Sequence, residues 1–341
     1  MRISLFKSIA SALLVCFATA SAAFAANLDL SGDSITYGYG VTASQRYSTQ
    51  LATALGLPEV NRGKNNDMAA DQAHKATIAT RVAGDKATIM VGTNDERTYG
   101  VNATKLGYYI GYLRRLAFDA VAPTRNYART AAVSKTGPWA NTQVNSFGMN
   151  TTTSGSTATA AVTGTSVYIG HIVQDHPSTQ GVAEIRVDGV LVGTVSSNGA
   201  GMKTANNLTY GPAVTRFSGF SAGAHTVEVK VVSASGYYFF LDFIAGNGNQ
   251  AGAKAFVSNV IRMTPAGYAT YGGSDANVSS YNSAISTMVS NFATDGLPVY
   301  LVDNWSAINP ATHMLADGIH PSAAGHTILK NNFQAVIQAN P

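Results

Sequence analysis

Leu28-Asp29-Leu30-Ser31-Gly32-Asp33-Ser34 opens the first strand–turn unit of the chain, and this stretch decides the fold. A short apolar segment that runs into Gly-Asp-Ser is typical of a buried strand followed by the start of a helix. Ala87–Val91 is a second such segment and ends in the same way, at Gly92-Thr93-Asn94-Asp95. Helical patterns surround these strands, at Tyr47–Leu55, 67–83 and Val101–Val121. The alternation of strands and helices predicts an α/β fold with a parallel sheet.

The middle of the chain has a different character. From about Asn126 to Gly246 the helical periodicity disappears, and Thr, Ser, Gly and Val dominate. Within this block, 184–195 indicates a hairpin, because Asp188-Gly189 supplies the positive φ angles of a tight turn. His225–Val232 alternates polar and apolar residues, which is the period of a strand. Several short strands with Gly-rich turns predict a β-sandwich.

The α/β pattern returns after Ala253. Two further strands are predicted at Ala255–Met263 and Pro298–Val302, and two helices at Ser280–Ala293 and 322–339. Neither flank of the β-rich block carries a complete sheet by itself. We therefore predict one α/β domain, formed by residues 26–125 and 247–341, with an inserted β-sandwich at 126–246.

Residues 1–25 have the pattern of a signal peptide. A basic start precedes an apolar run, Ile9–Ala20, and Ala23-Phe24-Ala25 is the small-x-small sequence that signal peptidases read. The run is short for a membrane span. We therefore expect cleavage after Ala25, a mature chain without stable membrane insertion, and a periplasmic or extracellular location. The single cysteine, Cys16, lies in this segment, so the mature chain has no disulfide or thiolate chemistry.

Charge and composition exclude several classes of partner. Without the leader residues Arg2 and Lys7, 20 basic residues face 18 acidic ones, a balance too mild to indicate a nucleic-acid partner. His171, Asp175 and His176 are of metal-ligating types, but they lie in the β-rich block without the spacing of a metal site. We expect no metal and no cofactor, and the sequence indicates no oligomeric state.

Three polar clusters could meet at one edge of the predicted sheet, because ligands bind beyond the carboxyl ends of its strands. Ser34 could be a nucleophile at a helix start, where backbone N–H groups stabilise an oxyanion, or a helix cap. Asn94 could donate its side-chain N–H to the same oxyanion, or form a local turn. Asp317 and His320 supply the base that a serine nucleophile needs and a partner to orient it. The alternative for this pair is a loop histidine with a capping aspartate.

Together these clusters resemble the SGNH, or GDSL-type, hydrolase family. Its first block matches Gly-Asp-Ser at 32–34, its third block matches Gly-x-Asn-Asp at 92–95, and its last block matches Asp-x-x-His at 317–320. Gly63 is the best candidate for the glycine of the second block, although Lys64 and Asn65 stand where the family usually has small residues. The resemblance covers about 26–124 and 253–341. It implies a flavodoxin-like three-layer α/β/α fold for that part of the chain.

The resemblance also implies a role for each residue. Ser34 would attack an ester carbonyl, His320 would take and return its proton, and Asp317 would orient His320. The backbone N–H groups of Ser34 and Gly63 and the side chain of Asn94 would hold the oxyanion. These residues would make the protein a serine esterase that works through an acyl-enzyme.

The β-rich block resembles, in style rather than by motif, the jelly-roll β-sandwiches of carbohydrate-binding modules. Trp139, Tyr210 and Tyr237 could stack on sugar rings, or pack in the core. An exported esterase with such an insert suggests an O-acetylesterase that acts on an acetylated polysaccharide. The alternatives are a lipase, arylesterase or thioesterase acting on small or lipid acyl esters, and a non-catalytic carbohydrate-binding protein.

Overall fold

The computed structural model describes residues 26–76, 84–121, 124–142, 148–176, 180–234, 237–248 and 253–341. The predicted signal peptide and the end of the helix predicted over 67–83 lie outside these ranges. No helix in the described ranges is long and apolar enough to cross a bilayer.

Five parallel strands form the central sheet, in the order β2-β1-β3-β15-β16. Their bounds are β1 (Leu28–Gly32), β2 (Glu59–Asn61), β3 (Lys86–Met90), β15 (Lys254–Ser258) and β16 (Val299–Val302). In chain order this is 2-1-3-4-5, the order of flavodoxin-like sheets, in which ligands bind where the order reverses between the first and third strands. The predicted parallel sheet is confirmed.

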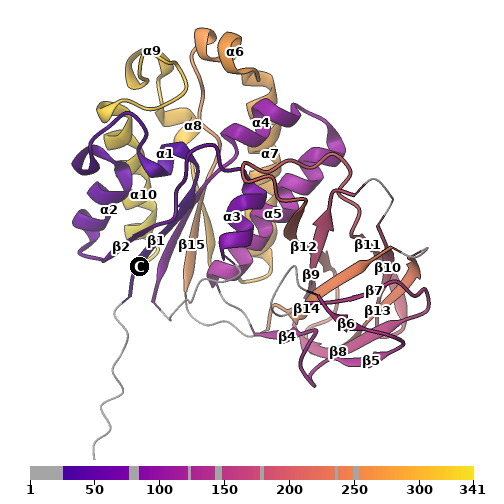
Figure 1. Ribbon diagram of the computed structural model, residues 1–341. Helices are drawn as coiled ribbons and strands as arrows, with labels where there is room; N and C mark the ends of the chain where they lie inside the picture. The colour runs from indigo at the N-terminus through magenta and orange to yellow at the C-terminus, as the bar shows by residue number, and fades with distance from the viewer. Residues whose placement is uncertain are drawn as a thin grey trace, which may run out of the picture.

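Helices cover both faces of this sheet (Figure 1). α2 (Tyr47–Leu55) and α10 (Ala323–Ala339) pack on one face, and α3 (Ala69–Ala76), α5 (Ala103–Val121) and α7 (Asp275–Thr294) pack on the other. Strand side chains alternate between the two faces. In β15, accordingly, Phe256 joins the α2–α10 core while Ala255 and Val257 join the core of α3, α5 and α7. The short helices are α1 (Ser34–Tyr37), α4 (Thr93–Tyr99), α6 (Pro265–Tyr271), α8 (Asn304–Ala307), α9 (Pro310–His313) and the 3₁₀ turn η1 (Ala43–Gln45).

Two predicted bounds in the second flank were wrong. The strand predicted over Ala255–Met263 ends at Ser258, because the N–H of Val260 donates to Asn282 of α7 (2.7 Å) rather than to a neighbouring strand. The helix predicted to begin at Ser280 begins at Asp275, because the hydroxyl of Ser274 caps it by accepting the N–H of Asn277.

Residues 125–246 contain two antiparallel sheets. One has the order β11-β10-β13-β8-β5, and the other has the order β12-β9-β14-β7-β6 with β4 also paired to β14. A shared apolar core contains side chains from both sheets, among them Val227 and Val229 of β13 and Leu241 of β14. The strands of the first sheet are β5 (Ser134–Thr136), β8 (Thr157–Thr163), β10 (Val182–Val187), β11 (Val190–Ser196) and β13 (Ala224–Ser233). Those of the second are β4 (Arg125–Tyr127), β6 (Ala140–Asn141), β7 (Met149–Thr151), β9 (Ser166–Gln174), β12 (Tyr210–Ser218) and β14 (Phe239–Gly246).

The predicted hairpin at 184–195 is confirmed. β10 and β11 pair antiparallel, and Asp188 (φ 51°) and Gly189 (φ 82°) form the turn between them. Both central residues have positive φ, as the tight turns that match strand twist require. The jelly-roll topology, the insertion boundaries and a carbohydrate-binding role for this block remain predictions.

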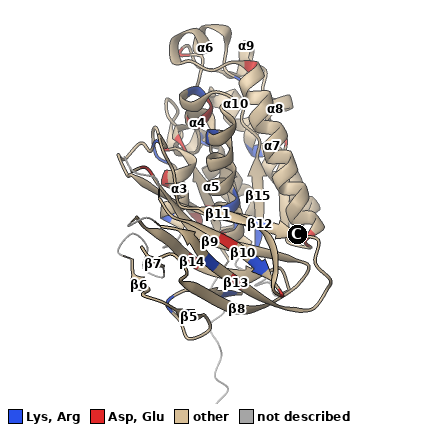
Figure 2. Ribbon diagram, turned by 90° about the vertical axis from the view of Figure 1, so that its right-hand side faces the viewer, with Lys and Arg blue, Asp and Glu red and all other residues tan. Residues whose placement is uncertain are grey.

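The antiparallel part is joined to the α/β part by a common core. α5 lies against β12, and Tyr168 of β9 and Phe243 of β14 belong to the same apolar cluster as Leu116 of α5 (Figures 1 and 2). Arg115 of α5 is 2% exposed and pairs with Asp119 of the same helix (2.6 Å) and with Asp242 of β14 (2.5 Å). The Arg115–Asp242 pair links α5 to β14 across the boundary between the two parts. Losing either of these residues would leave an uncompensated charge in the core. Charged side chains are otherwise sparse over the molecule (Figure 2).

Candidate active site

Ser34 lies where the first strand becomes a helix. β1 ends at Gly32, and the side chain of Asp33 caps α1 by accepting the N–H of Ile35 at 2.9 Å. The capping role that Ser34 could have had therefore belongs to Asp33, and Ser34 is the first residue of the helix. Asp33 is buried, and this burial raises the pKa of its carboxyl to about 7.

Ser34, His320 and Asp317 form one hydrogen-bonded line. The Oγ atom of Ser34 lies 2.8 Å from Nε2 of His320, and Nδ1 of His320 lies 2.7 Å from Oδ2 of Asp317. His320 comes from the loop between α9 and α10, 286 residues after Ser34. In this geometry Nε2 can accept the serine proton while Asp317 holds a proton on Nδ1, which is the arrangement of a serine nucleophile with its base.

The turn that carries Asp317 and His320 is fixed by close backbone contacts. Gly318 has φ 74°, and a Cβ there would lie 2.2 Å from the Oγ1 of Thr264. The carbonyl oxygen of Gly318 accepts the N–H of Thr264 at 2.9 Å, just before α6. Only glycine fits this backbone and this space, so the glycine inside Asp-x-x-His sets the geometry of the pair.

Asp317 is held in its ionised form. Partial burial opposes ionisation, but hydrogen bonds from the His320 ring and from the backbone N–H groups of His320 and Ile319 outweigh it. Together they lower the pKa of Asp317 below its ordinary value. An ionised carboxylate beside Nδ1 stabilises the imidazolium that forms when His320 takes a proton.

Asn94 lies at the start of α4, after β3, and is 5% exposed. Its Oδ1 accepts the Nε–H of Arg97 at 3.0 Å, and its Nδ2 donates to the carbonyl of Asp67 at 2.9 Å. These two bonds fix the orientation of the amide. An amide nitrogen carries two hydrogens, so one N–H of Asn94 is left for a ligand. Asp67 and Arg97 hold Asn94 in place, and sequence reasoning missed them because both contacts depend on the fold.

Gly63 was expected to offer its backbone N–H to an oxyanion, and in this structure that N–H is occupied. It donates to Oδ1 of Asn61 at 2.8 Å. The amide of Asn61 in turn donates to the carbonyl of Thr36 (2.8 Å) and to the hydroxyl of Ser48 (3.0 Å). The N–H of Gly63 would have to break its bond to Asn61 before it could donate to an oxyanion. The structure therefore does not present it as a free donor.

The three aromatic residues predicted to bind sugar have three separate sets of neighbours. Trp139 packs against the core of the antiparallel sheets and donates its indole N–H to the carbonyls of Thr136 and Thr157. Tyr210 makes an edge contact with His74 of α3, and Tyr237 lies beside His176. For Trp139 these contacts support the alternative of packing, whereas Tyr210 pairs with Gln174 of β9, two residues before the His176 that Tyr237 contacts.

Two exposed tyrosines at the site were missed. Tyr37 is 49% exposed and Tyr39 is 47% exposed, and the ring of Tyr39 lies 4.4 Å from the ring of His320. They belong to Tyr37-Gly38-Tyr39-Gly40, directly after the Gly-Asp-Ser turn, and both glycines have positive φ. Aromatic residues between glycines beside a predicted nucleophile were the signal available in the sequence.

The described residues contain no cluster of three or more His, Cys, Asp or Glu side chains that could hold a metal ion. His171 instead lies 3.0 Å from the hydroxyl of Thr215 through its Nε2. The side chain of Asp175 accepts the N–H of Gly201. The residues of metal-ligating type in the β-rich block therefore have other neighbours.

A parallel sheet in flavodoxin-like order, with a Ser–His–Asp line beyond the carboxyl end of its first strand, defines a hydrolase-type site. The sequence profile of the GDSL-like Lipase/Acylhydrolase family matches residues 30–147. This range includes Ser34 and Asn94, and Asp317 and His320 lie outside it. Over residues 30–147 the chain is therefore similar to the GDSL-like lipase/acylhydrolase family.

Several solved structures are distantly similar. A member of the lipolytic G-D-S-L family from Veillonella parvula has 10% identity and a TM-score of 0.46 over 92% of this chain and 99% of that one. Est24, a carbohydrate acetylesterase from Sinorhizobium meliloti, has 12% identity and a TM-score of 0.47 over 93% and 100%. The aryl esterase of M. smegmatis has 12% identity and a TM-score of 0.44 over 92% and 99%. No curated protein matches the chain in sequence.

Proposed function

We propose that this protein is an exported serine esterase that removes O-acetyl groups from a polysaccharide. The observation that carries the proposal is the hydrogen-bonded line from Ser34 through His320 to Asp317. Ser34 attacks the acetyl carbonyl while His320 takes its proton at Nε2. The same atom then protonates the leaving alcohol. Water, activated by His320, hydrolyses the acyl-enzyme and regenerates Ser34.

The leaving alcohol must lie beside Tyr39. A general acid acts over hydrogen-bond distance, about 3 Å, so the alcohol oxygen has to approach Nε2 of His320. The ring of Tyr39 is 4.4 Å from the His320 ring and half exposed, and Tyr37 is exposed to a similar extent. A sugar that carries the ester oxygen can therefore lay its C–H face against Tyr39. Aromatic rings offer such apolar area next to polar groups, and this supports a carbohydrate as the alcohol part of the substrate.

The proposal is tested by measuring acetate release from acetylated xylan, alginate and peptidoglycan, with p-nitrophenyl acetate as a small substrate. Wild type should release acetate from at least one polymer, and Ser34→Ala should release none while melting at the wild-type temperature. If the enzyme hydrolyses p-nitrophenyl esters but leaves all three polymers acetylated, the proposal of a polysaccharide substrate is refuted. A preference for octanoyl over acetyl esters would then favour the lipase alternative.

Tyr39→Ala tests the sugar contact separately. It should lower kcat/KM for the acetylated polymer by about two- to tenfold, since a ring contact contributes about 0.5–1.5 kcal/mol beyond its area. It should change p-nitrophenyl acetate hydrolysis little. Tyr238→Ala is the matched control, because Tyr238 is 46% exposed, close to the 47% of Tyr39, but directly precedes β14 of the antiparallel sheets. Loss of polymer activity in Tyr238→Ala but not in Tyr39→Ala would move the sugar site to the antiparallel sheets.

A further inference from the structure

A cavity of about 240 Å³ lies between α5 and the antiparallel strands β9, β11 and β12. Figure 2 shows these strands lying below α5. α5 contributes one face to the cavity, including Gly107, Tyr108 and Arg114, and the strands contribute His171 and Thr215 among others. Among the described residues that line it, none belongs to the Ser34 site and none is acidic.

Arg114 brings a positive charge to this cavity. Its Nη1 donates to the carbonyl of Val214 at 3.0 Å, and its Nε is buried. Within the described ranges, Nε has no hydrogen-bond partner, and Asp295 acts on Arg114 through its charge rather than through a hydrogen bond. Burial lowers the pKa of Arg114 to about 10, so the side chain is still charged at neutral pH. A largely buried charge that no carboxylate hydrogen-bonds destabilises the fold unless an anion joins it.

His171 adds a second unpartnered nitrogen. The residue is 5% exposed, and its Nδ1 is buried with no hydrogen-bond partner in the described part of the chain. Burial, together with the charges of Arg115 and Arg114, lowers the pKa of His171 to about 3, so the ring is neutral at neutral pH. The hydroxyl of Thr215 can donate a hydrogen bond to Nε2, and Nδ1 then carries the ring proton and can donate to an anion.

Gly107 leaves the cavity open on the helix side. Glycine inside a helix costs about 1 kcal/mol relative to alanine. A Cβ at this position would meet nothing within 4 Å, so packing does not require glycine here. At Gly111, by contrast, a Cβ would come within 3.3 Å of Ala213. The missing side chain at 107 therefore keeps space at the cavity edge.

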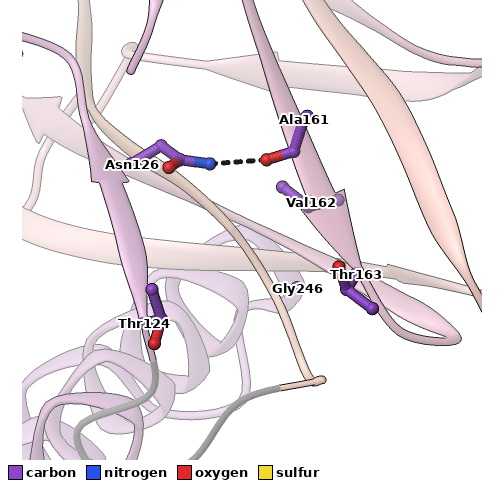
Figure 3. Close-up of a pocket in the computed structure, with 6 residues that line it drawn as sticks. All are labelled: Thr124, Asn126, Ala161, Val162, Thr163 and Gly246. Atoms are coloured by element: carbon purple, nitrogen blue, oxygen red, sulfur yellow. Dashed lines mark hydrogen bonds between the residues drawn. The ribbon is translucent and has the colours of Figure 1, made fainter. Parts of the chain in front are cut away.

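A second cavity serves as a comparison, because its described lining lacks the arginine and histidine of the first. It measures about 210 Å³ and is lined by Asn126, Ala161 and neighbouring residues of β4, β8 and β14 (Figure 3). None of the described residues in its lining is charged, and the amide of Asn126 donates to the carbonyl of Ala161 at 2.7 Å. Among the described residues that line it, this cavity offers an anion no charged group.

We propose that the cavity beside Arg114 and His171 binds a small carboxylate that also carries hydroxyl groups, such as a uronic acid. The carboxylate takes the guanidinium edge that Val214 leaves free, since arginine binds carboxylates through paired N–H groups. Thr104, Thr194, Ser196 and Asn198 line the cavity with groups that can bind hydroxyls, and Tyr108 offers a ring face. The proposal does not depend on ester hydrolysis at Ser34.

Calorimetric titration of the protein with glucuronate, glucose and acetate tests this. Glucuronate should bind one to one. Glucose should bind at least about tenfold more weakly, because a hydrogen bond to a charged group contributes about 1.5–3 kcal/mol. Acetate should also bind more weakly, because it lacks the hydroxyl groups. No detectable binding of glucuronate, or equal affinity for glucuronate and glucose, would overturn the proposal.

Two pairs of variants locate the site. Gly107→Leu should block glucuronate binding, whereas Gly107→Ala should retain it and raise the melting temperature. Arg114→Met should weaken binding at least about tenfold without lowering the melting temperature of the free protein, because it removes a largely buried charge. Arg114→Lys, which keeps the charge but not the paired N–H groups, should retain part of the affinity. Unchanged binding in Gly107→Leu would refute this location, even if Arg114→Met failed to fold.

Discussion

Replacing Asp317 by asparagine tests the site by changing one atom. The backbone N–H groups of Ile319 and His320 both donate to Oδ1 of Asp317 at 3.1 Å, and the oxygen of an asparagine can accept both bonds. The turn should therefore survive. The other carboxylate oxygen, now 2.7 Å from Nδ1 of His320, becomes an NH₂ group that can only donate. His320 then has to expose a lone pair at Nδ1 and carry its proton on Nε2, facing Ser34.

The histidine in that tautomer cannot accept the serine proton. In a comparable Ser-His-Asp site the wrong tautomer lowers turnover about 10⁴-fold, which corresponds to about 5 kcal/mol in the barrier. We expect this loss in kcat for p-nitrophenyl acetate, with KM and the melting temperature close to wild type. Asp317→Ala serves as a comparison that also removes the backbone contacts. Asp317→Asn with more than a tenth of wild-type kcat would refute the role of Asp317.

Three further predictions concern the surroundings of the site and the junction. Asn94→Ala should lower kcat by about two to three orders of magnitude, the usual effect of losing one oxyanion donor; an effect below threefold would exclude that role. Burial raises the pKa of Asp95 from 3.8 to about 8, so the folded carboxyl keeps a proton that the unfolded one releases. The free energy of unfolding should therefore fall as pH rises from about 4 to 8, and Asp95→Asn should flatten that fall in urea titrations; an unchanged slope would contradict this. Arg115→Ala should lower the free energy of unfolding by about 3–5 kcal/mol, because it removes the guanidinium that neutralises the buried carboxylates of Asp119 and Asp242; a loss below 1 kcal/mol would contradict this.

The sequence predicted the sheet well because its signals are local. Apolar runs that end in Gly-Asp-Ser and Gly-Thr-Asn-Asp marked the carboxyl ends of β1 and β3, and the structure has strands there. The predicted helix at Tyr47–Leu55 has the observed bounds. Bounds failed where a contact from elsewhere decided them, as at Val260, whose N–H binds Asn282 instead of extending a strand.

The same difference between local and long-range contacts explains which site residues the sequence predicted. Asp317 and His320 are three residues apart around a glycine, so their pairing is visible in the sequence. The state of the Gly63 N–H depends on Asn61 and on what holds the Asn61 side chain, which no local pattern reveals. The exposure of Tyr39 and its contact with His320 likewise depend on the packing of two loops. The unpaired groups of Arg114 and His171 are evident only once α5 and β9 are placed together.

The account rests on Ser34 as a nucleophile activated by His320, and labelling by a fluorophosphonate tests this most directly. The intact protein should gain the mass of one phosphonyl group, and peptide mapping should place it on Ser34. Ser34→Ala should gain none, and His320→Ala should react far more slowly. An unlabelled wild type, or a label that persists in Ser34→Ala, would contradict the central claim.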